Sequence, residues 1–406
     1  MRCSLDVGRS CRYEAGKLYS GEFASNASGR GPPVLRAVVD KSRRALLRYV
    51  PPQVTRHLPA QFKGPAPTPG PPPGISIETL DSVCAEALGG RIRRCAHQHV
   101  ARWKKHGTFR LYVVAENGTE RTFIFKDEIY TVDEIPALRE LSVLPGPPEF
   151  YVYTQSFNAP LGAFLPTVFW CAEIEPARHF RYLMEDLRLT HRKLHFKKKD
   201  LLFAVRVLAE VHKAMKLTLA DNNTPLIRYD QTYSKKMIEY SRSSLEEYSK
   251  ITGDAEVSEI IRLWPTILEY HEISAPFRNE LNQPIHGDYT LAHVHWRNGV
   301  DGAKIVDWEW AGIGLPHADL AAILKWADPA VKREGIRIFA REQEQLRFEE
   351  HARLLRWCLL ERKLLDAGFF ARQQIAKGRR GGRYFRRSVA DVLAIAKGLR
   401  HGATVE

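Results

Sequence analysis

The chain has 406 residues, a formal net charge of +14 and an apolar content of 44%, which allows one large or two modest domains with a hydrophobic core. It has no run of about 18 apolar residues and no apolar signal-peptide segment, so neither a transmembrane helix nor a signal peptide is expected. Its six cysteines form no Cys-x-x-Cys pair, which argues against a zinc or redox motif and favours reduced thiols in a cytoplasmic protein.

The positive charge is concentrated at the two ends of the chain. Residues 1–75 hold 12 Lys and Arg against 4 Asp and Glu, and residues 377–400 hold 8 against 1, so residues 76–376 are neutral. A neutral body gives no support for a nucleic-acid-binding domain. Two roles stay open for the basic ends, which are contact with an anionic surface or partner and an aid to solubility.

The first 75 residues are predicted to form an extension of the folded body. Residues 1–33 are rich in Gly, Ser and Arg without a period, which indicates disorder. Residues 34–50 are typical of a short basic amphipathic helix, which either packs on protein or lies at a membrane surface. Residues 51–74 are rich in Pro and predict a linker of polyproline character, so the folded body is expected to begin near Ile75.

The next part of the chain predicts β-structure. A helix is expected from Ser76 onward, capped by Ser76 or Thr79 and ending near Gly89-Gly90, because Ser and Thr can cap the start of a helix and Gly its end. Four segments rich in strand-forming residues follow: 109–115, 120–126, 167–171 and 178–184. The first two flank Asn117-Gly118, a strong hairpin signal because both residues tolerate positive φ. A helix is also predicted over Val132–Leu144.

The remaining sequence is mostly helical in pattern. Asp200 is expected to cap an amphipathic helix with apolar residues at helical spacing. Further helices are predicted over these segments: 231–249, 256–272, 317–327, 331–341, 343–369 and from Ser388 onward.

Two aspartates flank a short predicted hairpin within this helical part. Val294–Trp296 and Ala303–Val306 are strand-like and surround the turn signal Asn298-Gly299. Antiparallel pairing would bring Asp288 and Asp307 to the same end. Two close carboxylates are costly unless a cation lies between them, and Mg²⁺ binds one or two carboxylates together with substrate phosphates. The spacing indicates a metal–nucleotide site, and two ordinary loop aspartates are the alternative.

The sequence around these aspartates resembles the aminoglycoside phosphotransferase and choline kinase superfamily, relatives of protein kinases. The matching segments are Ile285-His286-Gly287-Asp288-Tyr289, Ile305-Val306-Asp307-Trp308-Glu309 and Gly312–Ala321. The resemblance implies an α+β, two-lobed protein-kinase-like fold, with a β-rich N-lobe over 76–186 and a helical C-lobe over 187–406. It also implies transfer of the γ-phosphate of ATP, with Mg²⁺, to a hydroxyl of a sugar, an amino alcohol or an aminoglycoside-like molecule.

The same resemblance implies roles for single residues. Asp288 is expected to orient or deprotonate the acceptor hydroxyl, and His286 to shape the catalytic loop. Asp307 is expected to hold Mg²⁺ against the phosphates, and Lys126 to bind those phosphates. Asp319 is expected to brace the loop from the start of the next helix.

Other parts of the nucleotide site are implied with less specific patterns. Glu140, with Glu134 as second choice, is expected to pair with Lys126. The backbone of Glu185 to Leu187 is expected to bind the adenine edge. The loop that covers the phosphates is expected over Lys104–Thr108, which has only one glycine.

One position departs from the family pattern. Where the family usually has a metal-binding Asn, five residues after Asp288, this chain has His293, and Mg²⁺ favours oxygen ligands. Three interpretations stay open: a site with one metal on Asp307, a nucleotide-binding pseudokinase that acts as an interaction module, and a lipopolysaccharide-type sugar kinase at a membrane surface. His293 is kept as a candidate metal ligand.

Overall fold

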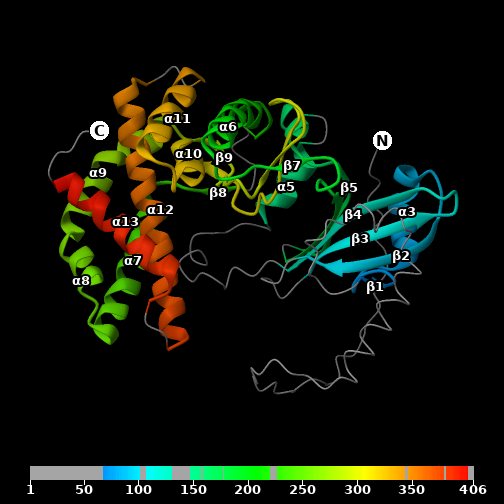
Figure 1. The fold of residues 1–406 in the computed structure, drawn as a ribbon, viewed down its shortest axis with the longest axis horizontal. Helices are drawn as coiled ribbons and strands as arrows, with labels where there is room; N and C mark the ends of the chain where they lie inside the picture. Colours follow the sequence, from blue (N-terminus) through cyan, green and yellow to red (C-terminus); the bar gives the residue numbers. More distant parts are fainter. Residues whose placement is uncertain are drawn as a thin grey trace. The chain divides into compact units, whose positions relative to one another are not determined.

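The computed structural model has strands in the first part of the chain and helices in the rest (Figure 1). It describes residues 67–100, 107–129, 147–156, 159–176, 178–219, 226–342, 346–378 and 381–400. The predictions for residues 1–33 and 34–50, and the helix predicted over Val132–Leu144, lie outside the described residues. None of the described helices is long and apolar enough to cross a bilayer.

A six-stranded antiparallel sheet forms the first part, in the order β1-β2-β3-β4-β6-β5. Its strands are β1 Thr68–Pro69, β2 Ile92–His99, β3 Thr108–Ala115, β4 Glu120–Ile129, β5 Val168–Glu175 and β6 His179–Glu185. All four predicted strand segments are confirmed. The β3–β4 turn contains Gly118 at φ 84°, and Asn117 ties this turn to the end of the preceding helix by donating to the carbonyls of Leu88 and Gly89.

The proline-rich segment is not a linker along its whole length, which corrects the prediction. Thr68 pairs with His97, and His97 Nδ1 lies 3.0 Å from the carbonyl oxygen of Gly70. Proline is tolerated here because β1 lies at the edge of the sheet, where a missing N–H breaks no ladder. The strand β2 was not predicted, because its polar residues give little strand signal and pairing with β3 supplies the order.

A helix and a hydrophobic layer stabilise this sheet. α3 spans Ile77–Leu88, with Ser76 accepting from Thr79 N at its start and Gly89 at φ 64° at its end, as predicted. Its buried side chains Leu80, Cys84 and Leu88 pack with sheet residues that include Phe123 and Leu183. A second helix, α5 Pro148–Gln155, was not predicted.

Helices make up most of the rest of the described chain. Its elements are the 3₁₀ turn η2 Pro160–Phe164 and the helices α6 Lys198–Leu219, α7 Gln231–Thr252, α8 Ala255–Arg262, α9 Trp264–Glu280, α10 His317–Leu324, α11 Pro329–Glu342, α12 Phe348–Ala376 and α13 Arg383–Arg400. The helix predicted over 256–272 is two helices, because Pro265 starts a new one at a position where no N–H donor is needed. Asp200 lies inside the first turn of α6 and accepts from His195 N at 2.9 Å, so it is not the cap.

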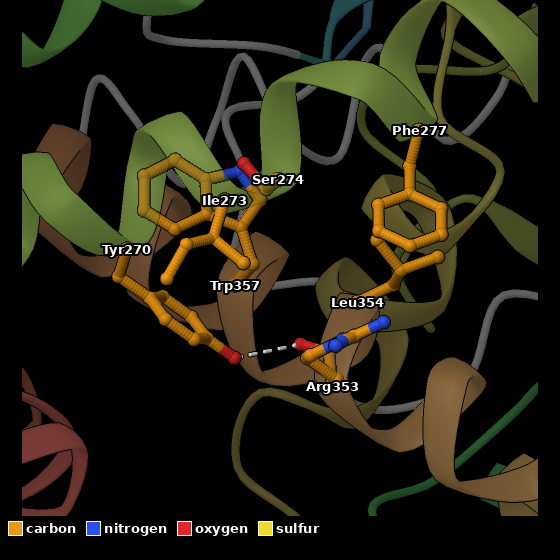
Figure 2. Close-up of a pocket in the computed structure, with 7 residues that line it drawn as sticks. All are labelled: Tyr270, Ile273, Ser274, Phe277, Arg353, Leu354 and Trp357. Atoms are coloured by element: carbon orange, nitrogen blue, oxygen red, sulfur yellow. Dashed lines mark hydrogen bonds between the residues drawn. The ribbon is translucent and has the colours of Figure 1, made fainter.

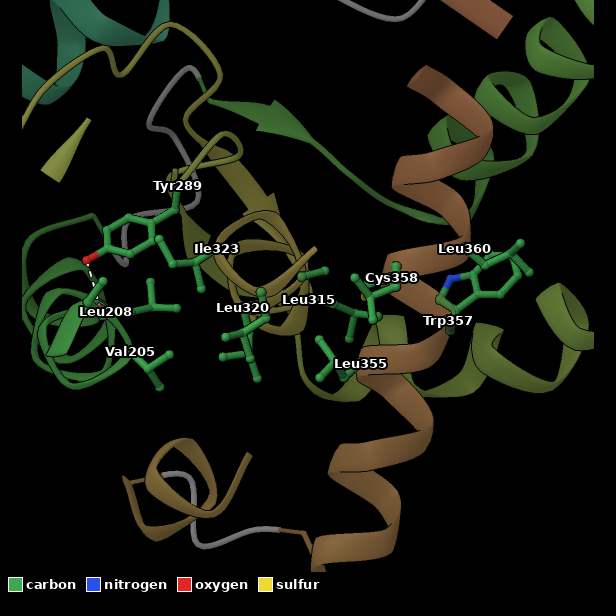
Figure 3. Close-up of a cluster of buried hydrophobic side chains, with 14 of the residues drawn as sticks. Val205, Leu208, Tyr289, Leu315, Leu320, Ile323, Leu355, Trp357, Cys358 and Leu360 are labelled. Atoms are coloured by element: carbon green, nitrogen blue, oxygen red, sulfur yellow. Dashed lines mark hydrogen bonds between the residues drawn. The ribbon is translucent and has the colours of Figure 1, made fainter. Parts of the chain in front are cut away.

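Figure 3 shows how this core reaches the loop that carries Asp288. Apolar side chains of α6, α10 and α12 interdigitate, among them Leu208, Leu320 and Leu355. Tyr289, directly after Asp288, is fully buried among them and donates to the carbonyl of Ala204 at 3.1 Å. The loop that carries Asp288 is therefore anchored in the largest hydrophobic cluster of the described residues.

The helical part also contains two small three-stranded sheets, and one of them holds the predicted hairpin. One has the order β11-β10-β7, with β7 Arg192–Lys193, β10 Val294–Trp296 and β11 Ala303–Ile305. The other has the order β8-β12-β9, with β8 Ile227–Arg228, β9 Gln283–Ile285 and β12 Gly312–Gly314. Val294 pairs with Ile305 in antiparallel register, which confirms the predicted hairpin.

Candidate active site

The hairpin brings Asp288, His293 and Asp307 together at one end. His293 lies between the two aspartates. Its Nδ1 is 2.8 Å from the backbone oxygen of Asp288, and its Nε2 is 3.3 Å from Oδ2 of Asp307. Asp307 has φ 70°, the single non-glycine residue with positive φ among the described residues. Such a backbone costs about 1–3 kcal/mol and is concentrated at functional sites.

Asp319 of α10 fixes the backbone of the loop that carries Asp288. Its carboxylate is fully buried and accepts from His286 N and Gly287 N, each at 2.8 Å, while His212 Nε2 lies 2.9 Å away. Gly287 has φ 81°, and a Cβ at this position would lie 2.0 Å from the carbonyl oxygen of Trp310. The loop can therefore take this close path only with glycine at 287.

His286 is enclosed and does not line the cleft. Its Nε2 lies 3.2 Å from the carbonyl oxygen of Val306, and its Nδ1 accepts from Asp288 N at 3.3 Å. Burial lowers the pKa of His286, although Asp319 opposes the shift. The neutral ring contacts the backbone of Val306 on one side and of Asp288 on the other. It therefore connects the loop to the end of β11, a geometry that would position Asp288.

The carboxylate of Asp288 is held by an arginine that the sequence did not point to. Arg362 of α12 donates from Nη2 to Oδ1 of Asp288 at 2.6 Å and from Nη1 to the carbonyl of Gly287 at 3.4 Å. Burial would raise the pKa of Asp288, but Arg362 and His293 hold it below its usual range. Asp288 is therefore ionised, with one oxygen fixed.

Lys126 lies on β4 amid acidic side chains. Its Nζ pairs with Glu149, and lies 3.5 Å from Oδ1 of Asp307 and 3.7 Å from Oε2 of Glu128. Burial would lower the pKa of Lys126, but Glu128, Glu149 and Asp307 raise it well above its usual value. A charged ammonium is thus directed from the sheet toward the aspartate of the hairpin.

The glutamate beside Lys126 is Glu149 of α5. It is 1% exposed, and its Oε1 accepts from the hydroxyl of Tyr153 at 2.9 Å. Burial raises the pKa of Glu149, and Lys126 opposes this shift. Glu140 and Glu134, the partners expected from sequence, lie outside the described residues. Glu149 was missed because α5 is short and begins at the second of two consecutive prolines, which gives little helical signal.

Several of these groups line a cavity of about 450 Å³, a size ordinary for small-ligand sites. Lys126, Glu149, His293, Asp307 and Glu309 line one part of the cavity. Met184, Glu185, Asp186 and Leu187, at the end of β6 and just after it, line another part, which we call the hinge. Glu185 N donates to the carbonyl of Thr167 at 2.9 Å, and the carbonyl of Leu187 accepts from His191 N at 2.7 Å. Both predicted hinge residues therefore border the cavity, although these two backbone groups already have partners.

A buried ion pair stiffens the hinge side of the cavity. Arg110 of β3 donates from Nε to Asp186 at 2.5 Å, and the hydroxyl of Thr122 donates to the same carboxylate at 3.1 Å. Sequence reasoning missed this pair, because its members are 76 residues apart. Of the loop expected over the phosphates, Lys104 and Lys105 lie outside the described residues.

The residues fit a metal–nucleotide better than a bare metal. Among the described residues, no group of three or more His, Cys, Asp or Glu is placed to hold a metal ion. Asp307 and His293 supply two ligands on the same side of the cavity. Mg²⁺ sites in nucleotide enzymes use one or two protein ligands and complete their shell with phosphate oxygens and water.

A second hollow lies between α9 and α12, lined by residues that include Tyr270, Phe277 and Trp357 (Figure 2). The hydroxyl of Tyr270 donates to the carbonyl of Arg353 across it at 3.1 Å. It offers no space that a water molecule could occupy, so it is not a ligand site in this conformation.

Comparison with known proteins agrees with this geometry. A model described as "Phosphotransferase enzyme family" matches residues 138–357, more than half of the chain. No curated protein matches the chain. A choline kinase from Cryptosporidium parvum Iowa II is similar in structure, with 12% identity, 80% of this chain and 97% of that chain covered, and a TM-score of 0.53.

A second similar structure is a microcompartment-associated aminopropanol kinase. It shares 12% identity, covers 80% of this chain and 98% of its own, and has a TM-score of 0.52. Identities this low show the fold alone. The two similar structures confirm the predicted α+β, two-lobed protein-kinase-like fold. The lobe boundary at residues 186–187 stays a prediction.

Proposed function

The chain belongs to the phosphotransferase enzyme family, whose members are kinases that phosphorylate hydroxyl groups with ATP and Mg²⁺, and on this premise we propose roles for its residues and a class of acceptor. Asp288 receives the acceptor hydroxyl. Lys126 binds the phosphates, and Asp307 and His293 flank the metal. The observation that carries this proposal is the convergence of Lys126, Asp288, His293 and Asp307 through contacts of 3.9 Å or less. Lys126, His293 and Asp307 also line the cavity.

In the proposed reaction, the acceptor oxygen forms a bond to the γ-phosphorus while the bond from that phosphorus to the bridging oxygen of ADP breaks. Oδ1 of Asp288 is held by Arg362, so Oδ2 is the oxygen that can accept the hydroxyl hydrogen. A bound metal ion would neutralise the negative charge on the phosphates, including the charge that develops on the leaving group. Catalysis by this chain then consists mainly of positioning and electrostatic stabilisation.

The charges beside Asp288 are balanced, which favours a neutral acceptor. The guanidinium of Arg362 lies 2.6 Å from the carboxylate, and Lys325 contacts the neighbouring Asp366 at 3.8 Å. Because each of these cations is paired with a carboxylate, the cluster has no surplus of negative charge to attract a polycationic aminoglycoside, whereas a sugar requires none. We therefore place sugars ahead of amino alcohols and aminoglycosides.

A sugar displayed at an anionic surface is the second candidate. Helix α13 exposes the basic side chains of Arg383, Arg386, Arg387 and Lys397, which would be drawn to such a surface. This candidate differs from the first in the presentation of the acceptor and not in the chemistry.

The test is a phosphorylation screen with the full chain and Mg·ATP against free sugars, sugar phosphates, amino alcohols, aminoglycosides and lipid-displayed saccharides. We expect turnover in one sugar class and its loss in Asp288→Asn. Turnover restricted to aminoglycosides would contradict the acceptor class. Unchanged turnover in Asp288→Asn would contradict the role of Asp288. Binding of Mg·ATP without turnover of any acceptor would favour an interaction module.

A further inference from the structure

The orientation of the His293 ring is fixed by its contacts. Nδ1 lies 2.8 Å from the backbone oxygen of Asp288, and because a carbonyl only accepts, Nδ1 must carry the hydrogen. The ring also stacks on His286, with centroids 5.9 Å apart and planes inclined by 23°. The side chain is 17% exposed, so little room remains for another rotamer.

This orientation turns the second ring nitrogen toward a carboxylate. Nε2 lies 3.3 Å from Oδ2 of Asp307, and in a neutral ring with hydrogen on Nδ1 it presents a lone pair. A lone pair and a carboxylate oxygen repel each other unless a cation is shared between them. The cation is either a proton on Nε2 or a metal ion bound to both atoms.

The surroundings match a metal-binding histidine. Histidine ligands usually donate their other N–H to a backbone carbonyl or carboxylate, which fixes the tautomer, and His293 does this with Asp288. Adjacent ligands of an octahedral ion at about 2.1 Å stand about 3.0 Å apart, near the 3.3 Å between Nε2 and Oδ2. Oδ1 of Asp307 faces Lys126 at 3.5 Å, so Oδ2 is the oxygen directed to this position.

We propose that Nε2 of His293 and Oδ2 of Asp307 bind one divalent cation together with nucleotide phosphate oxygens, and that the nitrogen donor shifts the preference of the site from Mg²⁺ toward Mn²⁺. Mg²⁺ favours oxygen ligands, whereas first-row transition ions accept imidazole more readily. This inference rests on the proposed function, because it requires that the cavity binds a metal–nucleotide.

The first test is spectroscopic and does not depend on turnover. Mn²⁺ is added to the full chain with a non-hydrolysable ATP analogue, and electron spin echo modulation from ¹⁴N is recorded. We expect nitrogen modulation in the native chain and its loss in His293→Asn. The matched control is His295→Gln, which removes another histidine that lines the cavity and should keep the signal.

The second test measures the affinities of the Mn²⁺ and Mg²⁺ complexes of the same analogue by calorimetry. His293→Asn should lower the Mn²⁺-to-Mg²⁺ affinity ratio at least about tenfold, the scale on which even outer-shell changes affect metal sites. Binding of both complexes without ¹⁴N modulation, or an unchanged ratio in His293→Asn, would overturn this inference and leave the proposed function intact. No binding of either complex to the native chain would overturn both.

Discussion

Asp288 and Asp307 lie at the same end of one hairpin, but their surroundings differ. Asp288 is held entirely by the helical part of the protein, with Arg362 on its carboxylate and Asp319 on the backbone just before it. Asp307 is more exposed, at 37% against 22% for the Asp288 side chain. Its side chain lies between Lys126 of the sheet and His293 of the loop.

This difference separates two kinds of preorganisation. The position of Asp288 is fixed before any ligand binds, as expected for a group that receives a hydroxyl. Asp307 joins the sheet to the helical part through Lys126 and faces a nitrogen of His293, which is where we propose that the nucleotide-bound cation binds. The first carboxylate should therefore govern the rate, and the second should govern nucleotide binding.

The largest expected effect comes from removing one charge at a time. Asp288→Asn should lower kcat about 10³-fold, within the usual range for a positioned acid–base group, while the Kd of a Mg–ATP analogue stays unchanged. Asp307→Asn should lower kcat and also weaken that Kd about tenfold or more, because it removes a metal ligand. Stopped-flow turnover and calorimetry measure the two quantities.

Two outcomes would contradict the comparison. A large loss of nucleotide affinity in Asp288→Asn would show that this carboxylate also holds the metal. Unchanged affinity in Asp307→Asn would show that the nucleotide binds without it. Asn at 288 can still accept from Arg362 through its side-chain oxygen, so the thermal midpoint of this variant serves as the control for folding.

Local patterns predicted much of the fold. The hairpin over β3 and β4 follows from Asn117-Gly118, and the hairpin over β10 and β11 from Asn298-Gly299. Two of the corrections to the predicted fold are also local. Pro265 starts a helix where a continuous one was expected, and Thr68–Pro69 forms an edge strand where a linker was expected. Both concern proline, whose effect depends on whether its missing N–H was needed.

Contacts between segments far apart in the sequence are the part of the site that could not be predicted. Asp288, His293 and Asp307 lie in or beside sequence motifs, and Lys126 lies at the end of a predicted strand. Their proximity could therefore be predicted. Arg362 lies in the helix predicted over 343–369, to which the sequence assigned no functional role, and its contact with Asp288 spans 74 residues. Glu149 belongs to a helix too short to predict. No local pattern encodes such partners, since tertiary packing brings them in.

Arg362 should show the second largest effect, because it fixes Asp288 without lining the cavity. Arg362→Met should lower kcat about 10²-fold, the scale of a misplaced catalytic group, with the KM for ATP unchanged. Arg362→Lys keeps the charge and should restore part of kcat. A rise in the KM for ATP with kcat unchanged would instead place Arg362 in nucleotide binding.

Glu149 should show the smallest effect, and it tests the sheet side of the comparison. Glu149→Gln keeps an oxygen for the hydroxyl of Tyr153 but removes the charge that holds Lys126. Loss of one charged hydrogen bond of about 1.5–3 kcal/mol should raise the KM for ATP at least about tenfold, with little change in kcat. The matched control is Glu128→Gln, because Glu128 lies 3.7 Å from the same ammonium and should matter less. An equal or larger effect at Glu128 would mean that Lys126 is held by the summed acidic field and not by the contact with Glu149.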